Sequence, residues 1–313
     1  MILSASRRTD IPAFYGEWMM NRLRAGYLLV RNPYRHSQIH RIRLNPDVVD
    51  CIVFWTKDPE PFLPQLKELD QMGYRYYFQF TVTPYGKRIE PFLREKSRIV
   101  KTFRELSGRI GPERVCWRYD PILLDEEYTC ERHQLEFEKL CQELSGFTDS
   151  VTISFLDLYR GLQKKGLRAC TPLEMAQLAA IVSGCARSHG LTVLACCEEM
   201  DMTPYGIRKG SCIDAQRIQK ICKAPLKAIR DSSQRTGCGC MQSTDIGAYN
   251  TCQNGCVYCY ATTSAAAARK RYEAHNPAGE FLTGELLTGE SIIGKPCVSL
   301  LVKDQMGLDL DGL

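Results

Sequence analysis

The sequence predicts an α/β fold because short β-rich segments alternate with longer amphipathic segments almost from the first residue. The alternation recurs six times, and polar residues gather where the predicted strands end. This pattern is typical of βα units that build a parallel sheet. We expect the six units to close partway into a (β/α)₆ barrel of the TIM type, and an open doubly wound sheet is the alternative arrangement.

Each predicted strand is a short run rich in branched and aromatic residues, which suit a pleated and half-buried surface. We expect strands at residues 2–5, 49–55, 76–82, 115–119, 150–155 and 191–196. The segments between them carry apolar residues three and four positions apart, which is the spacing of one helix face. We therefore expect helices at residues 14–25, 61–72, 96–106, 130–144, 172–188 and 214–224.

Polar side chains lie at or near the carboxyl ends of these strands. A single one marks only the start of a loop, so the argument depends on the whole set. The set comprises Ser4, Ser6, Thr56, Lys57, Gln79, Thr81, Thr83, Arg118, Asp120, Asp157 and Glu198. Because the carboxyl ends of parallel strands meet at one edge of the sheet, we predict a binding site at that edge.

Composition is that of a soluble globular protein: 313 residues, 25% charged, with a net charge of +5 and 16 cysteines. The positive excess is spread along the chain, so charge alone indicates no nucleic-acid arm. No apolar run is long enough to cross a membrane, and the residues after Arg7-Arg8 are too polar for an export signal. We expect a cytoplasmic protein, in which clustered cysteines bind metal or act in catalysis instead of forming disulfides.

The amino-acid composition of the sequence changes near residue 230. We interpret residues 1–230 as the partial barrel, residues 231–263 as a cysteine-rich segment and residues 264–313 as a C-terminal extension. The extension contains a near-repeat, Leu282-Thr283-Gly284-Glu285 followed by Leu287-Thr288-Gly289-Glu290. We expect this tail to be weakly ordered.

The closest cysteine spacing is Cys-x3-Cys-x2-Cys, formed by Cys252, Cys256 and Cys259. Three thiolates on one loop can hold three corners of a [4Fe–4S] cluster and leave the fourth iron open to a small ligand. Gly255 would let the backbone pass close to the inorganic sulfides. The sequence therefore predicts an iron–sulfur centre with an open iron, and a structural zinc site that also uses Cys238 or Cys240 is the alternative.

This cysteine motif, with Tyr258 before the last cysteine, resembles the signature of the radical S-adenosylmethionine (SAM) superfamily, and its Cys-x-Tyr-Cys-Tyr ending is similar to the spore photoproduct lyase branch. Over most of the chain, the sequence also resembles an uncharacterised bacterial family, domain of unknown function 1848. That resemblance is carried by residues 4–12, Val53-Phe54-Trp55-Thr56-Lys57, Cys212-Ile213-Asp214 and Asp245-Ile246-Gly247. The resemblance to the radical SAM superfamily implies a cluster that cleaves SAM, an electron donor such as a flavodoxin or ferredoxin, and a small-molecule or nucleic-acid substrate.

Two features depart from the superfamily pattern. The triad lies late in the chain, and no Gly-Gly-Glu is present to hold the methionine amino group. We expect residues 246–249 to form a last strand beside the first, which would bring the triad loop to the same edge as Ser6 and Arg7. Glu198 or Asp10 would then replace the missing carboxylate. The expected SAM-binding residues are Ser6, Arg7, Asp10, Gln79, Arg118, Glu198 and Tyr258.

Cys238 and Cys240 stand outside the triad. Together with Cys212 and either Cys196 or Cys197 they would supply four thiolates for a second, closed [4Fe–4S] cluster. The alternative is a buried Cys196 beside a reactive Cys238–Cys240 pair. Basic residues at the predicted edge could hold a carboxylate or phosphate, namely Arg7, Arg8, Lys57, Arg118 and Arg160.

Two hypotheses follow. The first is a radical SAM-like enzyme that uses the triad cluster to start radical chemistry on an unknown substrate. The second is an iron–sulfur or zinc-binding protein without SAM chemistry, which binds a ligand or nucleic acid. The chain has no P-loop, Gly-x-Gly-x-x-Gly or Gly-x-Ser-x-Gly motif that would support nucleotide hydrolysis, NAD binding or serine hydrolysis.

Overall fold

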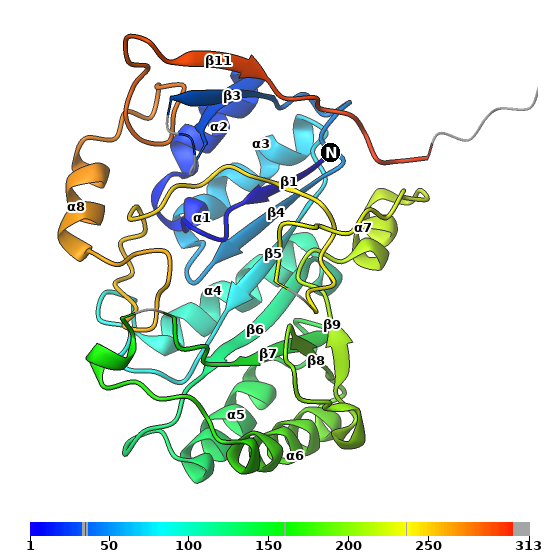
Figure 1. The fold of residues 1–313 in the computed structure, drawn as a ribbon. Helices are drawn as coiled ribbons and strands as arrows, with labels where there is room; N and C mark the ends of the chain where they lie inside the picture. The colour runs from blue at the N-terminus through cyan, green and yellow to red at the C-terminus, as the bar shows by residue number, and fades with distance from the viewer. Residues whose placement is uncertain (33–34, 36, 160, 236, 303–313) are drawn as a thin grey trace, which may run out of the picture.

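A parallel sheet of eight strands forms the centre of the computed structural model, which describes residues 1–32, 35, 37–159, 161–235 and 237–302 (Figure 1). The strand order is β10-β1-β4-β5-β6-β7-β8-β9, and every neighbouring pair is parallel. The strands are β1 (Ile2–Ala5), β4 (Cys51–Thr56), β5 (Tyr76–Thr81), β6 (Val115–Ile122), β7 (Ser150–Phe155), β8 (Thr192–Cys196), β9 (Arg208–Gly210) and β10 (Thr244–Asp245). The α/β class and all six predicted strands are confirmed.

Two strands lengthen the sheet beyond the prediction. The last strand of the sheet, β10, is Thr244–Asp245 and pairs with β1, so the expected strand at residues 246–249 is wrong by a few positions. β9 follows β8 at the other edge. Between the described residues no pairing joins β9 to β10, so closure into a barrel stays a prediction.

Three of the helices that connect the strands begin at a residue whose side chain caps the helix. The Thr171 hydroxyl and the Glu174 carboxylate form a capping box at the start of α6, and Thr129 and Asp214 cap α5 and α7. The helices are α1 (Ile11–Phe14), α2 (Gly16–Ala25), α3 (Leu66–Gln71), α4 (Lys96–Ile110), α5 (Cys130–Leu144), α6 (Pro172–Ser188), α7 (Ala215–Cys222) and α8 (Ala265–Glu273).

Short 3₁₀ helices occur at η1 (Glu60–Gln65), η2 (Pro112–Arg114), η3 (Gln163–Lys165) and η4 (Thr203–Tyr205). The helix expected over residues 61–72 is therefore α-helical only from Leu66. Pro64 explains the difference, because its ring and missing N–H disfavour α-helix in the preceding turn.

A second sheet of three strands, which the sequence analysis missed, lies beside the main one (Figure 1). It comprises β2 (Tyr27–Arg31), β3 (Gln38–Arg43) and β11 (Ser291–Gly294). β11 pairs in parallel with β3, and the Trp18 indole N–H donates to the carbonyl of Gly279 at 3.0 Å. The expectation of a weakly ordered tail is therefore wrong for its described part.

The two faces of the main sheet are covered differently. Helices pack on one face, where Phe54 stacks on Phe78 and Trp117 stacks on Phe137. The other face, which includes Ile2, Val53 and Tyr77, packs against a smaller cluster formed by residues 212–241 and α7. Cys238, Cys240 and Met241 of the cysteine-rich segment are thus part of the core on that face. No described helix is long and apolar enough to span a membrane.

Candidate functional site at the carboxyl edge of the sheet

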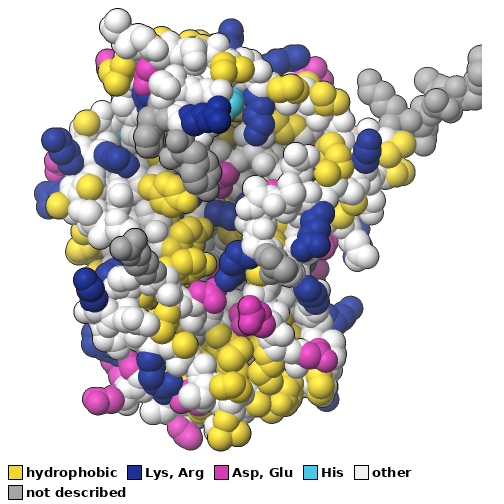
Figure 2. Space-filling model, viewed as in Figure 1, with side chains coloured by type: hydrophobic (Ala, Val, Ile, Leu, Met, Phe, Trp, Pro, Cys, Tyr) yellow, Lys and Arg dark blue, Asp and Glu magenta, His cyan; other side chains and the backbone are white. Residues whose placement is uncertain are grey.

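A cavity of about 850 Å³ lies where the main strands end. Its walls come from residues at or near the carboxyl ends of β4, β5, β6, β7 and β8 and from the residues after β1, together with loops from the last third of the described chain. The face drawn in Figure 2 is hollowed near its centre, where basic, acidic and apolar side chains meet. Eight cysteines line the cavity: Cys196, Cys197, Cys212, Cys238, Cys240, Cys252, Cys256 and Cys259.

We call residues 252–259 the triad loop. Cys256 is buried, whereas Cys252 and Cys259 are half-buried. The loop is fixed by a backbone hydrogen bond from the Val257 N–H to the Ile89 carbonyl, at 2.9 Å. Burial raises the pKa of the Cys256 thiol to about 12, although the charge of Lys57 acts against this.

Backbone geometry favours glycine at Gly255, and its expected closeness to inorganic sulfides stays a prediction. Its φ of +67° lies in the left-handed region, and a Cβ there would come within 2.6 Å of the Phe92 ring. The neighbour of Gly255 is therefore a protein side chain, and the absence of a Cβ accommodates Phe92 and Pro91.

A buried carboxylate, Glu90, ties the triad loop to the sheet. It accepts hydrogen bonds from Lys57 Nζ at 2.7 Å, from Lys96 Nζ and from the hydroxyl of Tyr258. Burial alone would raise the pKa of Glu90, but the charges of Lys57 and Lys96 outweigh it and lower the pKa to about 2. Glu90 is therefore ionised and holds Tyr258, the aromatic residue before Cys259.

Asp10 connects the same loop to the start of α1. Its Oδ1 accepts from the Ala13 N–H at 3.2 Å, and its Oδ2 accepts from the Lys57 N–H at 2.8 Å and from Asn254 Nδ2 at 3.1 Å. Burial raises the pKa of Asp10 to about 6 in spite of these donors. Most of its acceptor capacity is already used within the protein.

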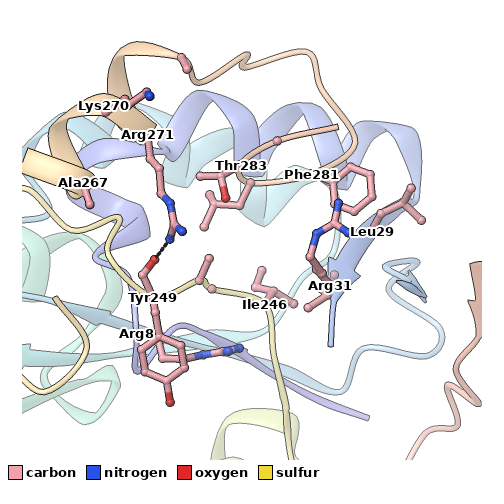
Figure 3. A pocket seen from close by; sticks show the side chains of 16 residues that line it. Arg8, Leu29, Arg31, Ile246, Tyr249, Ala267, Lys270, Arg271, Phe281 and Thr283 are labelled. Carbon is pink, nitrogen blue, oxygen red and sulfur yellow. Dashed lines mark hydrogen bonds between the residues drawn. The ribbon is translucent and has the colours of Figure 1, made fainter. Parts of the chain in front are cut away.

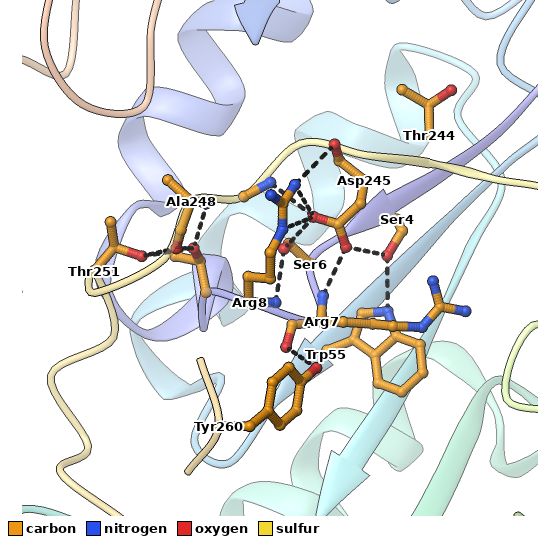
Figure 4. A network of polar contacts seen from close by, with 12 residues as sticks. Ser4, Ser6, Arg7, Arg8, Trp55, Thr244, Asp245, Ala248, Thr251 and Tyr260 are labelled. Carbon is orange, nitrogen blue, oxygen red and sulfur yellow. Dashed lines mark hydrogen bonds and ion pairs between the residues drawn. The ribbon is translucent and has the colours of Figure 1, made fainter. Parts of the chain in front are cut away.

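Asp245 organises the segment that joins β10 to the triad loop (Figure 4). Its carboxylate accepts from the hydroxyls of Ser4 and Ser6 at 2.9 and 2.7 Å, from the Arg7 N–H at 2.9 Å and from Arg8 Nη2 at 2.9 Å. Burial would raise the pKa of Asp245, but the Arg8 charge and these donors hold it below its usual value.

Gly247 lets this segment pass against β1, because a Cβ would lie 2.1 Å from Ser6 Oγ. The sequence analysis placed the triad loop at the edge that carries Ser6 and Arg7. The structure places it there, with the hydroxyl of Tyr260 donating to the Arg7 carbonyl at 2.9 Å.

A second group of thiols lies on the other side of the cavity. Cys196 Sγ and Cys212 Sγ are 3.0 Å apart, and Cys238 and Cys240 line the same cavity and belong to the same buried cluster as Cys212. We call Cys196, Cys212, Cys238 and Cys240 the four-thiol group. The hydrogen bond with Cys212 lowers the pKa of Cys196 to about 7, and the neighbouring thiols of Cys212 and Cys238 hold the pKa of Cys240 well below its usual value.

Two arginines separate the thiol groups. Arg118 Nη1 donates to Cys212 Sγ at 2.7 Å, and its Nη2 is ion-paired with Asp120. Arg7 lies close enough to Cys240 for the charges of the two side chains to interact. The two guanidinium groups lie 5.0 and 5.2 Å from the ring centre of Trp55, within the range of a cation–π interaction.

The cavity contains most of the predicted site residues but not all of them. Ser6, Arg7, Asp10, Arg118 and Tyr258 line it, together with the triad cysteines. Gln79 and Glu198 are absent from the described lining: Gln79 Nε2 donates to the Cys212 carbonyl at 2.7 Å, and Glu198 Oε1 accepts from the Phe155 N–H at 2.8 Å. Arg160 lies outside the described residues.

Sequence reasoning missed Glu90 and the structural role of Asp245. Asp245-Ile246-Gly247 was visible as a motif, whereas Glu90 lies in a loop with no local pattern that would reveal its burial. The structure also selects Cys196 over Cys197 for the four-thiol group, because Cys196 contacts Cys212 directly. Within the described ranges, no three or more histidine, cysteine or acidic side chains are arranged as ligands of one metal ion.

A second pocket, of about 610 Å³, lies between α8, β2 and the segment after β10 (Figure 3). Arg8, Arg31, Lys270 and Arg271 line it beside apolar residues, and none of its described lining residues is acidic. Arg271 donates a hydrogen bond to the Tyr249 carbonyl, and Arg8 lies 5.3 Å from the Tyr249 ring centre. None of the described residues that line this pocket is a cysteine.

Comparison with known proteins gives a family but no activity. A family model described as "Domain of unknown function (DUF1848)" matches residues 2–261. No curated protein matches the chain. A solved structure, described as a putative alpha-L-fucosidase from Bacteroides thetaiotaomicron, is 11% identical with a TM-score of 0.22, and the alignment covers 72% of this chain and 83% of that one. A likeness this weak supports no argument about function.

Proposed function

The chain belongs to the DUF1848 family, and on that premise we propose that it is a radical SAM-like enzyme with a [4Fe–4S] cluster on Cys252, Cys256 and Cys259. The observation that carries the proposal is that all three thiols face one cavity at the carboxyl edge of a parallel sheet. Three thiolates are the donor set of a cluster with an open iron. Bound there with SAM, a reduced cluster would supply one-electron cleavage of the sulfonium carbon–sulfur bond.

The residues around the triad loop suit a charged cofactor. Arg7 supplies a guanidinium group for a carboxylate, and Arg118 and Asp120 line the same cavity as an ion pair. Tyr260 is exposed by 43% and lies 5.3 Å from the Tyr159 ring, so it offers an aromatic face. Asp10 fits the ammonium group of SAM poorly, because its oxygens already accept three hydrogen bonds.

The protein's own part in this function is to position the cluster and exclude water. Glu90 and Asp10 fix the triad loop through Tyr258 and Asn254. Lys57 lies 5.4 Å from the ring centre of Tyr258 and lowers the cost of negative charge at Cys256. An external one-electron donor of the flavodoxin or ferredoxin class completes the proposal.

Anaerobic reconstitution with iron and sulfide tests this function. We expect the Cys256→Ser variant to lose the [4Fe–4S] electron paramagnetic resonance signal and the release of 5′-deoxyadenosine from SAM under dithionite. Cys297→Ser is the matched control, because Cys297 is half-buried and lies outside the described lining of the cavity. A wild-type protein that holds iron but releases no 5′-deoxyadenosine would contradict the proposal.

A second candidate function is a metal-bearing binding protein without SAM chemistry. The cationic pocket beside α8 favours it, because four basic residues and no described acidic one suit a phosphate-bearing ligand. Nucleic-acid binding through such contacts weakens steeply as salt rises. Salt-sensitive binding of single-stranded oligonucleotides, in the absence of SAM cleavage, would favour this candidate over the first.

A further inference from the structure

Two cysteines of the four-thiol group, Cys196 and Cys212, have their sulfur atoms in direct contact. The two Sγ atoms are 3.0 Å apart. A covalent disulfide has an S–S distance of about 2.05 Å, so the sulfurs would have to approach by about 1 Å to be joined. The side chains are therefore placed for a bond between them with little rearrangement of the chain.

The main sheet brings the two cysteines to adjoining positions. Cys196 is the last residue of β8, and its partner in the register with β9 is Gly210. A Cβ at Gly210 would lie 2.8 Å from Leu194 Cβ, so glycine lets β9 approach β8 closely. Cys212 follows two residues later. Because neighbouring strands lie about 4.8 Å apart, the contact is a product of the strand order.

The backbone of Cys212 is fixed without the use of its sulfur. The Cys212 carbonyl accepts hydrogen bonds from Tyr77 Oη and Gln79 Nε2, both at 2.7 Å. Both donors belong to β5, and both side chains are buried. Cys212 is therefore held in place whether its sulfur is a free thiol or is bonded to another sulfur.

The two sulfurs differ in charge and in access. Cys196 is half-buried and Cys212 is buried, and both line the cavity. The hydrogen bond between them lowers the pKa of Cys196 to about 7 and raises the pKa of Cys212 above its usual value. Arg118 Nη1 donates to Cys212 Sγ at 2.7 Å, and a guanidinium group there stabilises a thiolate. Since the thiolate is the nucleophile, Cys196 is the first of the two to react.

We propose that Cys196 and Cys212 form a redox-active dithiol that undergoes thiol–disulfide exchange with small organic disulfides that enter the cavity. Cys196 attacks the disulfide, and Cys212 completes the exchange. In a reducing compartment such a pair would form its disulfide transiently, as catalytic and redox-sensing pairs do. The proposal depends neither on an iron–sulfur cluster nor on SAM chemistry at the triad.

The exchange takes place in two steps. The Cys196 thiolate attacks one sulfur of the organic disulfide, breaks its S–S bond and releases a thiolate, which takes a proton from solvent. Cys212 then loses its proton to solvent and attacks Cys196 Sγ in the mixed disulfide, which releases the second organic thiol. The two cysteines lose two electrons, and the organic disulfide is reduced to two thiols. Arg118 stabilises the Cys212 thiolate in the second step.

Peptide mapping of the full wild-type chain tests the dithiol. The protein is reduced, freed of reductant under argon, incubated with oxidised glutathione, alkylated and digested with trypsin. Trypsin separates the two cysteines, because Cys196 lies in residues 188–208 and Cys212 in residues 210–217. We expect mass spectrometry to find these two peptides joined by a disulfide in the folded protein.

The neighbouring cysteine supplies a matched control. Cys197 is half-buried, lines the same cavity and lies in the same tryptic peptide as Cys196. We expect Cys197→Ser to keep the link to Cys212 and Cys196→Ser to lose it. A link that survives Cys196→Ser, or one that joins Cys196 to Cys240 in the wild type, would overturn the assignment of the pair.

Two variants test the order of the steps. We expect Cys212→Ser to stop at the mixed disulfide, with one glutathione bound to Cys196. Cys196→Ser should leave Cys212 without glutathione, because Cys212 is buried. Glutathione on Cys212 in a Cys196→Ser variant with native circular dichroism would contradict the proposed order.

The same treatment distinguishes this proposal from the proposed function. Absence of the link in folded wild-type protein would overturn the dithiol, and iron held by Cys196 and Cys212 in its place would favour the second cluster predicted from the sequence. A link in a protein that releases no 5′-deoxyadenosine would support the dithiol and contradict the radical SAM function. Release of 5′-deoxyadenosine without the link would contradict the dithiol alone.

Discussion

The triad loop carries its three thiols within residues 252–259, whereas the four-thiol group collects its sulfurs from residues 196–240. The triad loop is anchored by the buried carboxylates of Glu90 and Asp10. The four-thiol group is anchored mainly through backbone carbonyls, with Arg118 and Arg7 against its sulfurs. We infer that protonation of carboxylates would disturb the first group more than the second.

The largest effect on stability is expected from the segment between the two thiol groups, because Asp245 in this segment holds β10 to β1. We expect Asp245→Ala to lower the free energy of unfolding by about 4 kcal/mol, since it removes several hydrogen bonds and leaves the Arg8 charge with no carboxylate. Urea unfolding measures the change. Asp47→Ala is the control: its pair with Arg43 is exposed and 3.8 Å long, so we expect a loss below about 0.5 kcal/mol.

Equal stability of the Asp245→Ala and Asp47→Ala variants would show that the network in Figure 4 does not hold the two thiol groups in place. Loss of stability with unchanged thiol reactivity in both groups would limit the role of Asp245 to β1 and β10.

The triad side can be disturbed alone with Glu90→Gln. We expect a loss of about 2–3 kcal/mol, because Lys57 and Lys96 would face a neutral amide and Tyr258 would lose a charged acceptor. The pKa of Glu90 is lowered to about 2, so its stabilising effect is present above its ordinary pKa and is lost as pH falls toward 2. The difference between wild type and variant should therefore shrink on acidification below about pH 4.5.

Alkylation of the metal-free protein, followed by mass spectrometry, measures how fast each cysteine of the same variant reacts. Cys256 should react faster in Glu90→Gln than in wild type, while Cys212 should be unchanged. Equal acceleration at both cysteines would contradict the separate anchoring of the two groups.

Tyr77→Phe disturbs the four-thiol group alone, as Glu90→Gln disturbs the triad loop. Tyr77 donates to the Cys212 carbonyl at 2.7 Å, so we expect a loss of about 1–2 kcal/mol and faster alkylation of Cys212 but not of Cys256. Tyr27→Phe is the control, because its hydroxyl bonds Glu280 at the surface. If alkylation in Tyr77→Phe became faster at Cys256 than at Cys212, the prediction that Tyr77 anchors the four-thiol group and not the triad loop would be wrong.

Sequence reasoning found the triad loop and missed the anchors for a physical reason. Cys252, Cys256 and Cys259 show their relation in local spacing, and the six strands show theirs in residue type. Glu90 and Asp245 act through partners distant in sequence, so no local pattern reveals their anchoring role, although Asp245-Ile246-Gly247 is visible as a motif. Cys238 and Cys240 could be paired with Cys212, but the choice of Cys196 required the end of β8 to be placed.

The second sheet was also missed because its strand pairing joins residues that are distant in sequence. β11 is exposed at all four positions, so it has no apolar alternation that would predict a strand. Its partner β3 lies far away in the sequence, and pairing across such a distance leaves no local trace. The main sheet was predictable because its strands are buried and its helices are amphipathic.

The smallest expected effect concerns Glu198, the one acidic residue beside the four-thiol group whose pKa is raised to about 7. Burial is the main cause, with the charges of Asp157 and Asp120 adding to it. Between the ordinary glutamate pKa and about 7, the folded chain keeps a proton that the unfolded chain has lost, so stability falls as pH rises through this window. Glu198→Gln keeps an acceptor for the Phe155 N–H but removes the charge.

We therefore expect Glu198→Gln to be more stable than wild type above about pH 7, by about 1 kcal/mol after allowance for its partial exposure. Near pH 4.5 the two proteins should be equally stable, because Glu198 is then largely protonated in the folded chain. Urea unfolding between these pH values measures the difference. If the free energy of unfolding of the two proteins changed with pH in the same way, Glu198 would have an ordinary pKa. The pH dependence of stability would then come from the carboxylates of the triad side alone.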